Sequence, residues 1–209
     1  MAEFVADTQS APSAPSAGTM ILYPETTTSQ FVSRDSAGRY QTFGDVANQS
    51  VTAQAYTTSE IYLTGSALTV PAHGLQVGAR CSWRVVATKT AGTGAPIWRL
   101  YKGTLGTTGD TIIATLTQAS APTSVADTAI YDIQAVLRNT GASGVMLFSL
   151  YMTHVLQITG FSQLPANVQQ VAATAFDTTA SGLIIGISVN YQTAGAGNIE
   201  QVTAKLDNC

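Results

Sequence analysis

The sequence predicts an all-β protein, an antiparallel β-sandwich with jelly-roll-like topology that follows an extended N-terminal arm and hairpin. From about residue 49 onward, short segments rich in β-branched and aromatic residues alternate with Gly, Pro, Asn or Ser. Apolar residues at helical spacing are nearly absent, and several segments alternate apolar with polar residues. Many short strands without helices between them favour a sandwich or barrel over a parallel α/β sheet. The strand order is left open by the sequence.

Ten segments are predicted as strands of this sandwich. They are residues 49–56, 61–70, 81–89, 96–103, 110–118, 128–139, 144–156, 168–176, 183–191 and 199–207. Alternation within 81–89 predicts that one set of side chains faces the core, namely Cys81, Trp83, Val85 and Ala87. The glycine-containing stretches 90–95 and 103–110 are predicted to be hairpin loops.

The first 45 residues have a different character. Residues 11–18, APSAPSAG, are typical of a flexible linker, and three short strand-like segments follow it. Of these, 29–35 and 39–43 could pair as a hairpin around a turn at 35–38. An isolated hairpin is only marginally stable in water, so this one needs a partner surface: the sandwich, another copy, or a different protein. We therefore expect a docking segment at 1–45 and a sandwich domain at 46–209.

The charge and composition narrow the function classes. Charged residues make up 10% of the 209 residues, where about 25% is usual, and this indicates a protein packed in an assembly or exposed outside a cell. A net charge of −3 offers no basic field for nucleic acid. The N-terminus has no secretory-signal pattern, and the longest apolar run, 145–152, is far shorter than the ~20 residues of a membrane span. We expect synthesis in a cytoplasm, with no membrane and no nucleic-acid partner.

Residues able to carry catalysis or bind a metal are sparse. The imidazoles are His73, in a loop, and His154, at a strand end, and no G-x-S-x-G nucleophile motif occurs. Cys81 is expected to be a buried thiol, and Cys209 is the last residue, so no zinc-ligand spacing exists. Most of the isolated aspartates are expected on surface loops, among Asp7, Asp110, Asp127, Asp132 and Asp177. We predict no enzyme activity, no metal and no cofactor, although a glycosidase-type carboxylate pair from distant strands stays open.

Aromatic residues within strands have two interpretations. They anchor a core or an interface, which is the commoner case, or they form a platform on which sugars stack. The residues concerned are Trp83, Trp98, Tyr101, Tyr131, Tyr151 and Tyr191.

Four stretches, which together make up about a third of the chain and are spread from residue 12 to residue 146, carry a family resemblance. They are the P-x-x-P-x-x-G-x-x-x-L-Y stretch from Pro12 to Tyr23, FVSRDSAGR at 31–39, residues 62–103, and VLRNTGASGVM at 136–146. In these stretches the chain resembles small β-sandwich structural proteins of tailed bacteriophages, of the head-decoration or fibre type. The resemblance implies a virion component, usually a homotrimer, whose N-terminal arm docks on the particle while the β domain projects or clamps. It transfers no catalytic residue.

The expected function is therefore that of a decoration or cement protein on the capsid surface of a tailed-phage virion. Its arm would bind the major capsid protein, and the candidate docking residues are Leu22, Tyr23, Phe31, Arg34, Tyr40 and Phe43. The alternative is a tail or head fibre protein that binds a host receptor or glycan. A glycan-degrading enzyme is disfavoured because no catalytic constellation is found.

Overall fold

The computed structural model describes residues 10, 12–24, 31–36, 40–43, 46–72, 74–156, 159–162, 166–180 and 182–207. For residues 40–43, 46, 166 and 167 it describes the backbone alone. The described residues form strands and turns, and they contain no helix of the length and apolarity needed to cross a membrane.

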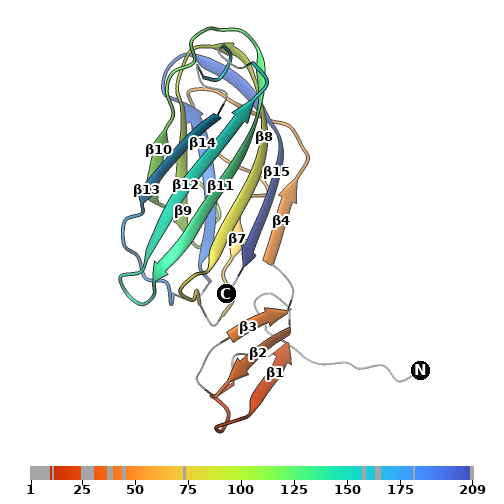
Figure 1. The fold of residues 1–209 in the computed structure, drawn as a ribbon, viewed down its shortest axis with the longest axis vertical. Helices are drawn as coiled ribbons and strands as arrows, with labels where there is room; N and C mark the ends of the chain where they lie inside the picture. The colour runs from red at the N-terminus through yellow and green to blue at the C-terminus, as the bar shows by residue number, and fades with distance from the viewer. Residues whose placement is uncertain are drawn as a thin grey trace, which may run out of the picture.

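The larger sheet has seven strands within the described part of the chain, in the order β13-β12-β11-β8-β15-β4, with β5 also pairing with β15. Its strands are β4 (Val46–Ser50), β5 (Gln54–Tyr56), β8 (Arg80–Gly92), β11 (Asp127–Asn139), β12 (Val145–His154), β13 (Ala166–Ala172) and β15 (Gly195–Asp207). Every pair is antiparallel. β8 therefore lies near the centre of the sheet, between β11 and β15 (Figure 1).

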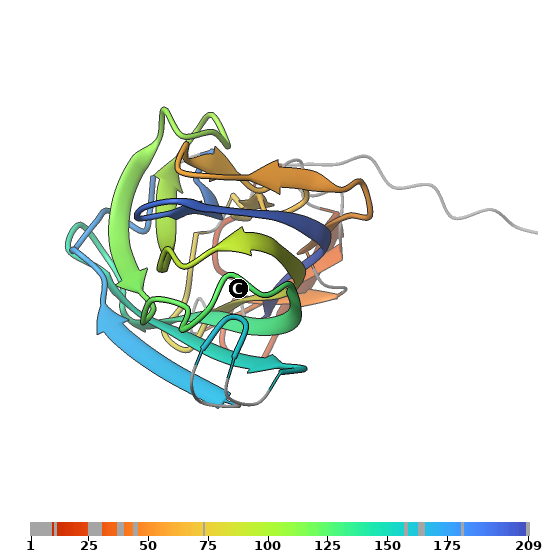
Figure 2. The same ribbon diagram turned by 90° about the horizontal axis from the view of Figure 1, so that it is seen from above.

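The smaller sheet has the order β10-β9-β14-β6, with β7 also pairing with β14. Its strands are β6 (Ile61–Tyr62), β7 (Leu68–Thr69), β9 (Pro96–Gly103), β10 (Thr111–Thr117) and β14 (Ile184–Tyr191). Seen from above, the two sheets enclose a common interior (Figure 2). The predicted antiparallel sandwich is confirmed.

The strand pairing is that of a jelly roll. The first strands pair with the last, because β4 and β5 pair with β15, and β6 and β7 pair with β14. The strands between them pair in the same nested way, β8 with β11 and β9 with β10. Successive nested pairs alternate between the two sheets, as in a long hairpin rolled into a sandwich. β12 and β13 are additions that extend the larger sheet beyond β11.

Aromatic side chains fill the space between the sheets. The ring of Trp98 lies 4.6 Å from that of Tyr131, and Tyr56 stacks on Tyr191 at 4.8 Å, measured between ring centroids. The predicted inward set of β8, which begins with Cys81 and Trp83, is at most 1% exposed. The indole N–H of Trp83 donates to the carbonyl of Ser66 at 2.7 Å, so its polar atom is also satisfied.

Two of the predicted strands are each divided in two. Residues 49–56 split between β4 and β5, and residues 61–70 split between β6 and β7. The second break is a turn at Gly65, which has a φ of 83°. A Cβ at Gly65 would lie 2.5 Å from the backbone of Gln49, so the turn is packed directly against β4.

The predicted hairpin at 90–95 is wrong, whereas the one at 103–110 is confirmed. β8 and β9 lie in different sheets, and the residues between them cross from one to the other. Gly92 has a φ of 83° there, and the Gly94 N–H donates to the Ala194 carbonyl at 2.9 Å. β9 and β10 do form a hairpin, closed by the Asp110 carboxylate, which accepts the N–H of Gly106 at 2.7 Å.

Gly92→Ala is expected to destabilise the protein more than Gly141→Ala. Both glycines have a positive φ, which costs an alanine about 1–2 kcal/mol. A Cβ at Gly92 would in addition lie 2.5 Å from the Ala194 carbonyl oxygen, whereas a Cβ at Gly141 meets nothing within 4 Å. Urea unfolding should therefore give the lower midpoint for Gly92→Ala, and equal midpoints would contradict the close packing of this crossing.

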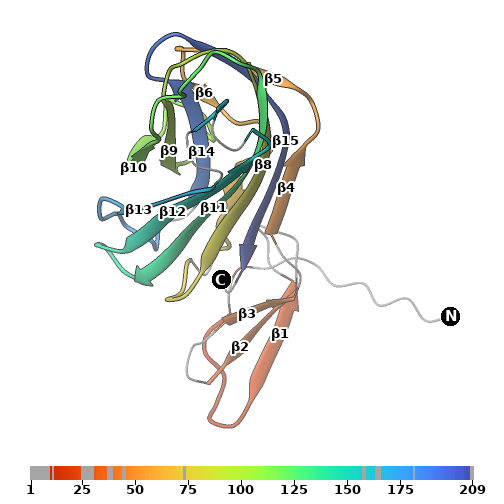
Figure 3. The same cartoon turned by 45° about the horizontal axis from the view of Figure 1, so that its top comes forward.

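A separate sheet precedes the jelly roll. It has the order β1-β2-β3, with β1 (Met20–Pro24), β2 (Phe31–Asp35) and β3 (Tyr40–Phe43), and the predicted hairpin between the last two is confirmed. None of the strand pairs among the described residues joins it to the jelly roll. It lies beyond the end of the jelly roll at which β4 begins and β15 ends (Figure 3). The boundary proposed at residue 45 falls between β3 and β4.

Candidate functional site

The three-stranded sheet has one covered face and one open apolar face. Tyr23 and Val32 are fully buried on the covered face, where Arg34 also donates a hydrogen bond to the carbonyl of Pro12. On the other face Met20 is 65%, Leu22 59% and Phe31 38% exposed. Side chains two residues apart on a strand point to the same face, so Met20, Leu22 and Pro24 share this face of β1. Phe31 is the cross-strand partner of Pro24 on β2, and cross-strand partners also share a face. We call Met20, Leu22 and Phe31 the open apolar face.

The predicted docking residues divide between these faces. Leu22 and Phe31 lie together on the open apolar face, and Met20 is an addition whose spacing from Leu22 could have identified it. Tyr23 is fully buried on the covered face, so its side chain is not available to a partner. The backbone of Tyr40 pairs with Arg34 and that of Phe43 with Phe31, and the side chains of Tyr40 and Phe43 lie outside the described part of the structure.

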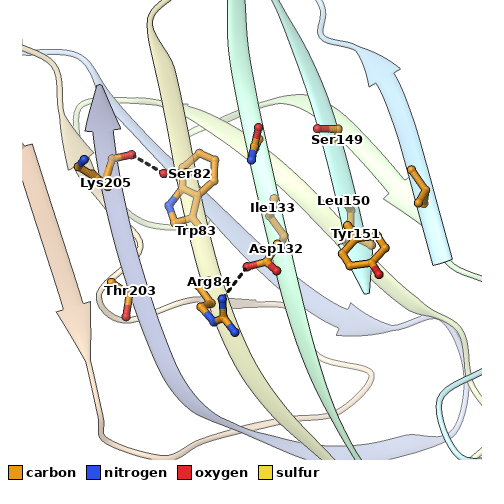
Figure 4. A pocket seen from close by; sticks show the side chains of 12 residues that line it. Ser82, Trp83, Arg84, Asp132, Ile133, Ser149, Leu150, Tyr151, Thr203 and Lys205 are labelled. Atoms are coloured by element: carbon orange, nitrogen blue, oxygen red, sulfur yellow. Dashed lines mark hydrogen bonds and ion pairs between the residues drawn. The ribbon is translucent and has the colours of Figure 1, made fainter. Parts of the chain in front are cut away.

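A second surface of interest is a hollow of about 570 Å³ on the outer face of the larger sheet (Figure 4). It is formed by side chains that alternate with the core residues of β8, β11, β12, β13 and β15. One cross-strand row runs through it, Thr203, Arg84, Asp132, Tyr151 and Val168. Arg84 and Asp132 form an ion pair at 3.7 Å, with side chains 61% and 44% exposed. We call this the outer-face hollow.

The structure separates the six strand aromatics. Five are at most 2% exposed. Trp83, Trp98, Tyr131 and Tyr191 pack between the sheets, whereas Tyr101 lies on the outer face of the smaller sheet, where Glu60 and Tyr62 contact it. Tyr151 is 42% exposed and lines the outer-face hollow (Figure 4). Five of the aromatic residues are therefore buried anchors, the commoner of the two interpretations. A sugar-stacking role stays open for Tyr151.

A polar network covers the outer face of the smaller sheet. The Glu60 carboxylate accepts hydrogen bonds from the hydroxyls of Tyr101 and Ser188, and it lies 3.3 Å from the Arg99 guanidinium. Arg99 also donates to the Asn190 side chain at 2.6 Å. Burial, the hydrogen bond to Glu60 and the Glu60 charge raise the pKa of Tyr101 to about 12. Through these contacts Glu60, the residue before β6, is bound to β9 and β14.

A buried carboxylate–imidazole pair lies at the opposite end of the jelly roll from the small sheet. Asp127 Oδ2 is 2.7 Å from His154 Nδ1, and both side chains are fully buried. Asp127 also accepts the backbone N–H groups of Thr128, Leu156 and Phe161, at 2.8, 3.2 and 3.1 Å. The carboxylate thus fixes the loop that follows β12, which is a structural role.

The expectation of a surface position is wrong for Asp127, and Asp132 lies on a strand rather than a loop. Asp177 is exposed as expected, and Cys81 is buried as expected. Asp7, His73 and Cys209 lie outside the described residues. Among the residues that are described, no group of three or more His, Cys, Asp or Glu is arranged to hold a metal ion.

Comparisons with known proteins add little. No protein-family model and no curated protein matches the chain. Among solved structures, a chain in the structure of infectious bursal disease virus Gx strain matches with a TM-score of 0.22 and 8% identity. The match covers 100% of this chain and 47% of the viral one, so the chain spans about half of that viral chain's length. The neighbour is viral but is not a tailed-phage protein, and a TM-score this low establishes neither shared topology nor shared function.

Proposed function

We propose that this protein is a non-catalytic structural component of a tailed-phage virion, a decoration protein that binds the major capsid protein on the capsid exterior. The observation that carries the proposal is the open apolar face of the small sheet. Met20, Leu22 and Phe31 present apolar side chains on an element that pairs with no strand of the jelly roll in the described part of the chain.

The physical argument starts from stability. A three-stranded sheet buries little apolar surface, and leaving Met20 and Leu22 mostly exposed, with Phe31 partly exposed, forgoes the stabilisation that fuller burial would give. Contact with another protein supplies that burial. β1 also lies at the edge of its sheet, where an extended segment of a partner can add as a further strand. Side-chain burial and strand addition would therefore act at the same place.

The composition and the fold agree with an assembly role. A surface poor in charge suits a protein that functions within a particle. Jelly rolls occur in viral capsid proteins and in lectin domains, although a fold alone assigns no function. We further propose a homotrimer, the state that the resemblance to head-decoration proteins implies. Three small docking sheets on one assembly would then bind together at high effective concentration. Size-exclusion chromatography with light scattering tests this, and a monomeric mass in solution would contradict it.

The docking proposal is tested by co-sedimentation of the purified protein with capsids that lack it. The double variant Leu22→Asp, Phe31→Asp should weaken binding by about tenfold or more, because two charges would be desolvated in place of two apolar contacts. The matched control is Val51→Asp, which alters an apolar residue of the jelly roll that is 77% exposed. Circular dichroism should show that all variants remain folded. Equal sedimentation of the double variant and the control would refute docking through this face.

A further inference from the structure

We propose that the outer-face hollow is a carbohydrate-binding site, with Tyr151 as the stacking platform and the Arg84–Asp132 pair as the hydroxyl-binding group. The hollow belongs to the jelly roll and is independent of the small sheet. Its volume of about 570 Å³ lies within the ~300–1,000 Å³ range of small-molecule sites.

Tyr151 is the first element of the argument. Burial of five of the six strand aromatics leaves one ring on the surface, and it lies in the hollow beside Val168, its cross-strand partner on β13. Val168 is 71% exposed, so the two side chains form a small apolar shelf at one side of the hollow. An aromatic ring offers a flat apolar surface and a hydroxyl at its edge. A pyranose ring has the complementary form, with a face of C–H groups and a rim of hydroxyls.

The ion pair is the second element. Arg84 and Asp132 are held opposite each other by the β8–β11 register, yet their charged atoms are 3.7 Å apart and well exposed. The loose pair leaves both groups accessible to a ligand. Adjacent sugar hydroxyls can accept from a guanidinium and donate to a carboxylate, so a diol can bridge the two.

Further polar side chains continue the surface in the next cross-strand row. That row contains Lys205, Ser82, Gln134 and Ser149, all of which line the hollow. Hydroxyl and amide groups both donate and accept, which suits a ligand with many hydroxyls. Figure 4 shows Ser82, Arg84, Asp132 and Tyr151 projecting from three adjacent strands into one space.

A second copy of the chain fits this surface less well. Protein interfaces of specific complexes bury about 800 Å² per partner and have an apolar centre depleted of charge. Here the charged pair occupies the middle of the row, and the apolar shelf lies at one side. The arrangement therefore favours a polar ligand of limited size that contacts one aromatic ring.

The experiment begins with the purified full-length protein on an array of neutral and acidic oligosaccharides. A bound oligosaccharide is then titrated against variants by saturation-transfer NMR or calorimetry. Tyr151→Ala and Arg84→Ala should each weaken binding by about tenfold or more. The matched control is Ile112→Ala, which removes a side chain of 45% exposure on β10, in the other sheet, and should leave affinity unchanged.

Three outcomes would overturn the proposal: no oligosaccharide bound by the intact protein, binding unaffected by Tyr151→Ala, or an equal loss in Ile112→Ala. Preference for acidic over neutral sugars would assign the leading role to Arg84 and Lys205, and the reverse preference would assign it to Tyr151. Because no capsid is present, the result does not depend on the docking proposal. Tyr151→Ala should also co-sediment normally with capsids.

Discussion

Asp127→Ala is expected to lower the free energy of unfolding by about 3–5 kcal/mol, because three backbone N–H groups and the His154 imidazole lose the acceptor that they share. The Asp127 carboxylate contacts His154 and accepts backbone N–H groups on both sides of the loop after β12. Alanine would leave these donors without their acceptor, and a donor that stays buried and unsatisfied, such as the Phe161 N–H, costs about 1–3 kcal/mol. The loop contains Phe161, whose ring packs against Tyr131, so the damage would reach the aromatic core.

The control for this prediction is Asp132→Ala, five residues further along β11. Asp132 forms an exposed ion pair with Arg84, and pairs of this kind contribute about 0–1 kcal/mol. Urea unfolding followed by circular dichroism should therefore separate the two variants clearly. Should Asp127→Ala fail to fold, Asp127→Asn keeps the shape and one acceptor oxygen and should be intermediate. Similar midpoints for Asp127→Ala and Asp132→Ala would show that the buried carboxylate contributes little.

The strands of the jelly roll could be predicted because their side chains obey a local rule. Cys81 and Trp83 alternate with Ser82 and Arg84, and burial follows that alternation along β8. The crossing at 90–95 escaped prediction because a glycine-rich loop between two strands has the same composition whether or not the strands pair. The pairing is decided by the chain near Gly195, which lies beside Gly92 in the fold and about a hundred residues away in the sequence.

The residues of the candidate sites also divide into those that a local pattern places and those that only the non-local strand pairing places. Tyr151 lies between Leu150 and Met152, which are both buried, so alternation within β12 already places it on the outer face. The hollow itself depends on the β8–β11–β12 register, which no local pattern defines. The Asp127–His154 pair is also non-local, because the two residues meet only when adjacent long strands align. The burial of Tyr23 could not be predicted, because the covered face of β1 and β2 is defined by a non-local contact, in which Arg34 donates to the carbonyl of Pro12.

Raising the pH above 10 is expected to unfold the jelly roll cooperatively, because its buried tyrosines must become charged. Burial is the main cause that raises the pKa of Tyr191 to about 12, and it also raises the pKa of Tyr56, Tyr62 and Tyr131. A raised pKa in the folded state means that folding favours the neutral phenol. The resulting stability is fully present below pH ~10, where an unfolded tyrosine is still neutral, and it is lost progressively as the pH rises through the folded-state pKa.

The magnitude is large because several groups contribute together. For Tyr191 alone, a pKa raised from about 10 in the unfolded chain to about 12 in the folded protein corresponds to roughly 2–3 kcal/mol of stability. The phenolate absorbance of the buried rings and the circular dichroism of the strands should therefore change in one transition, since ionisation of these rings requires unfolding. Tyr191→Phe should reduce the pH dependence of stability above pH 10, at the cost of the 2.9 Å hydrogen bond between the Tyr56 and Tyr191 hydroxyls at neutral pH. If the phenolate signal of the buried rings appears while the strands remain folded, water reaches the space between the sheets and the interior is less tightly packed than the structure shows.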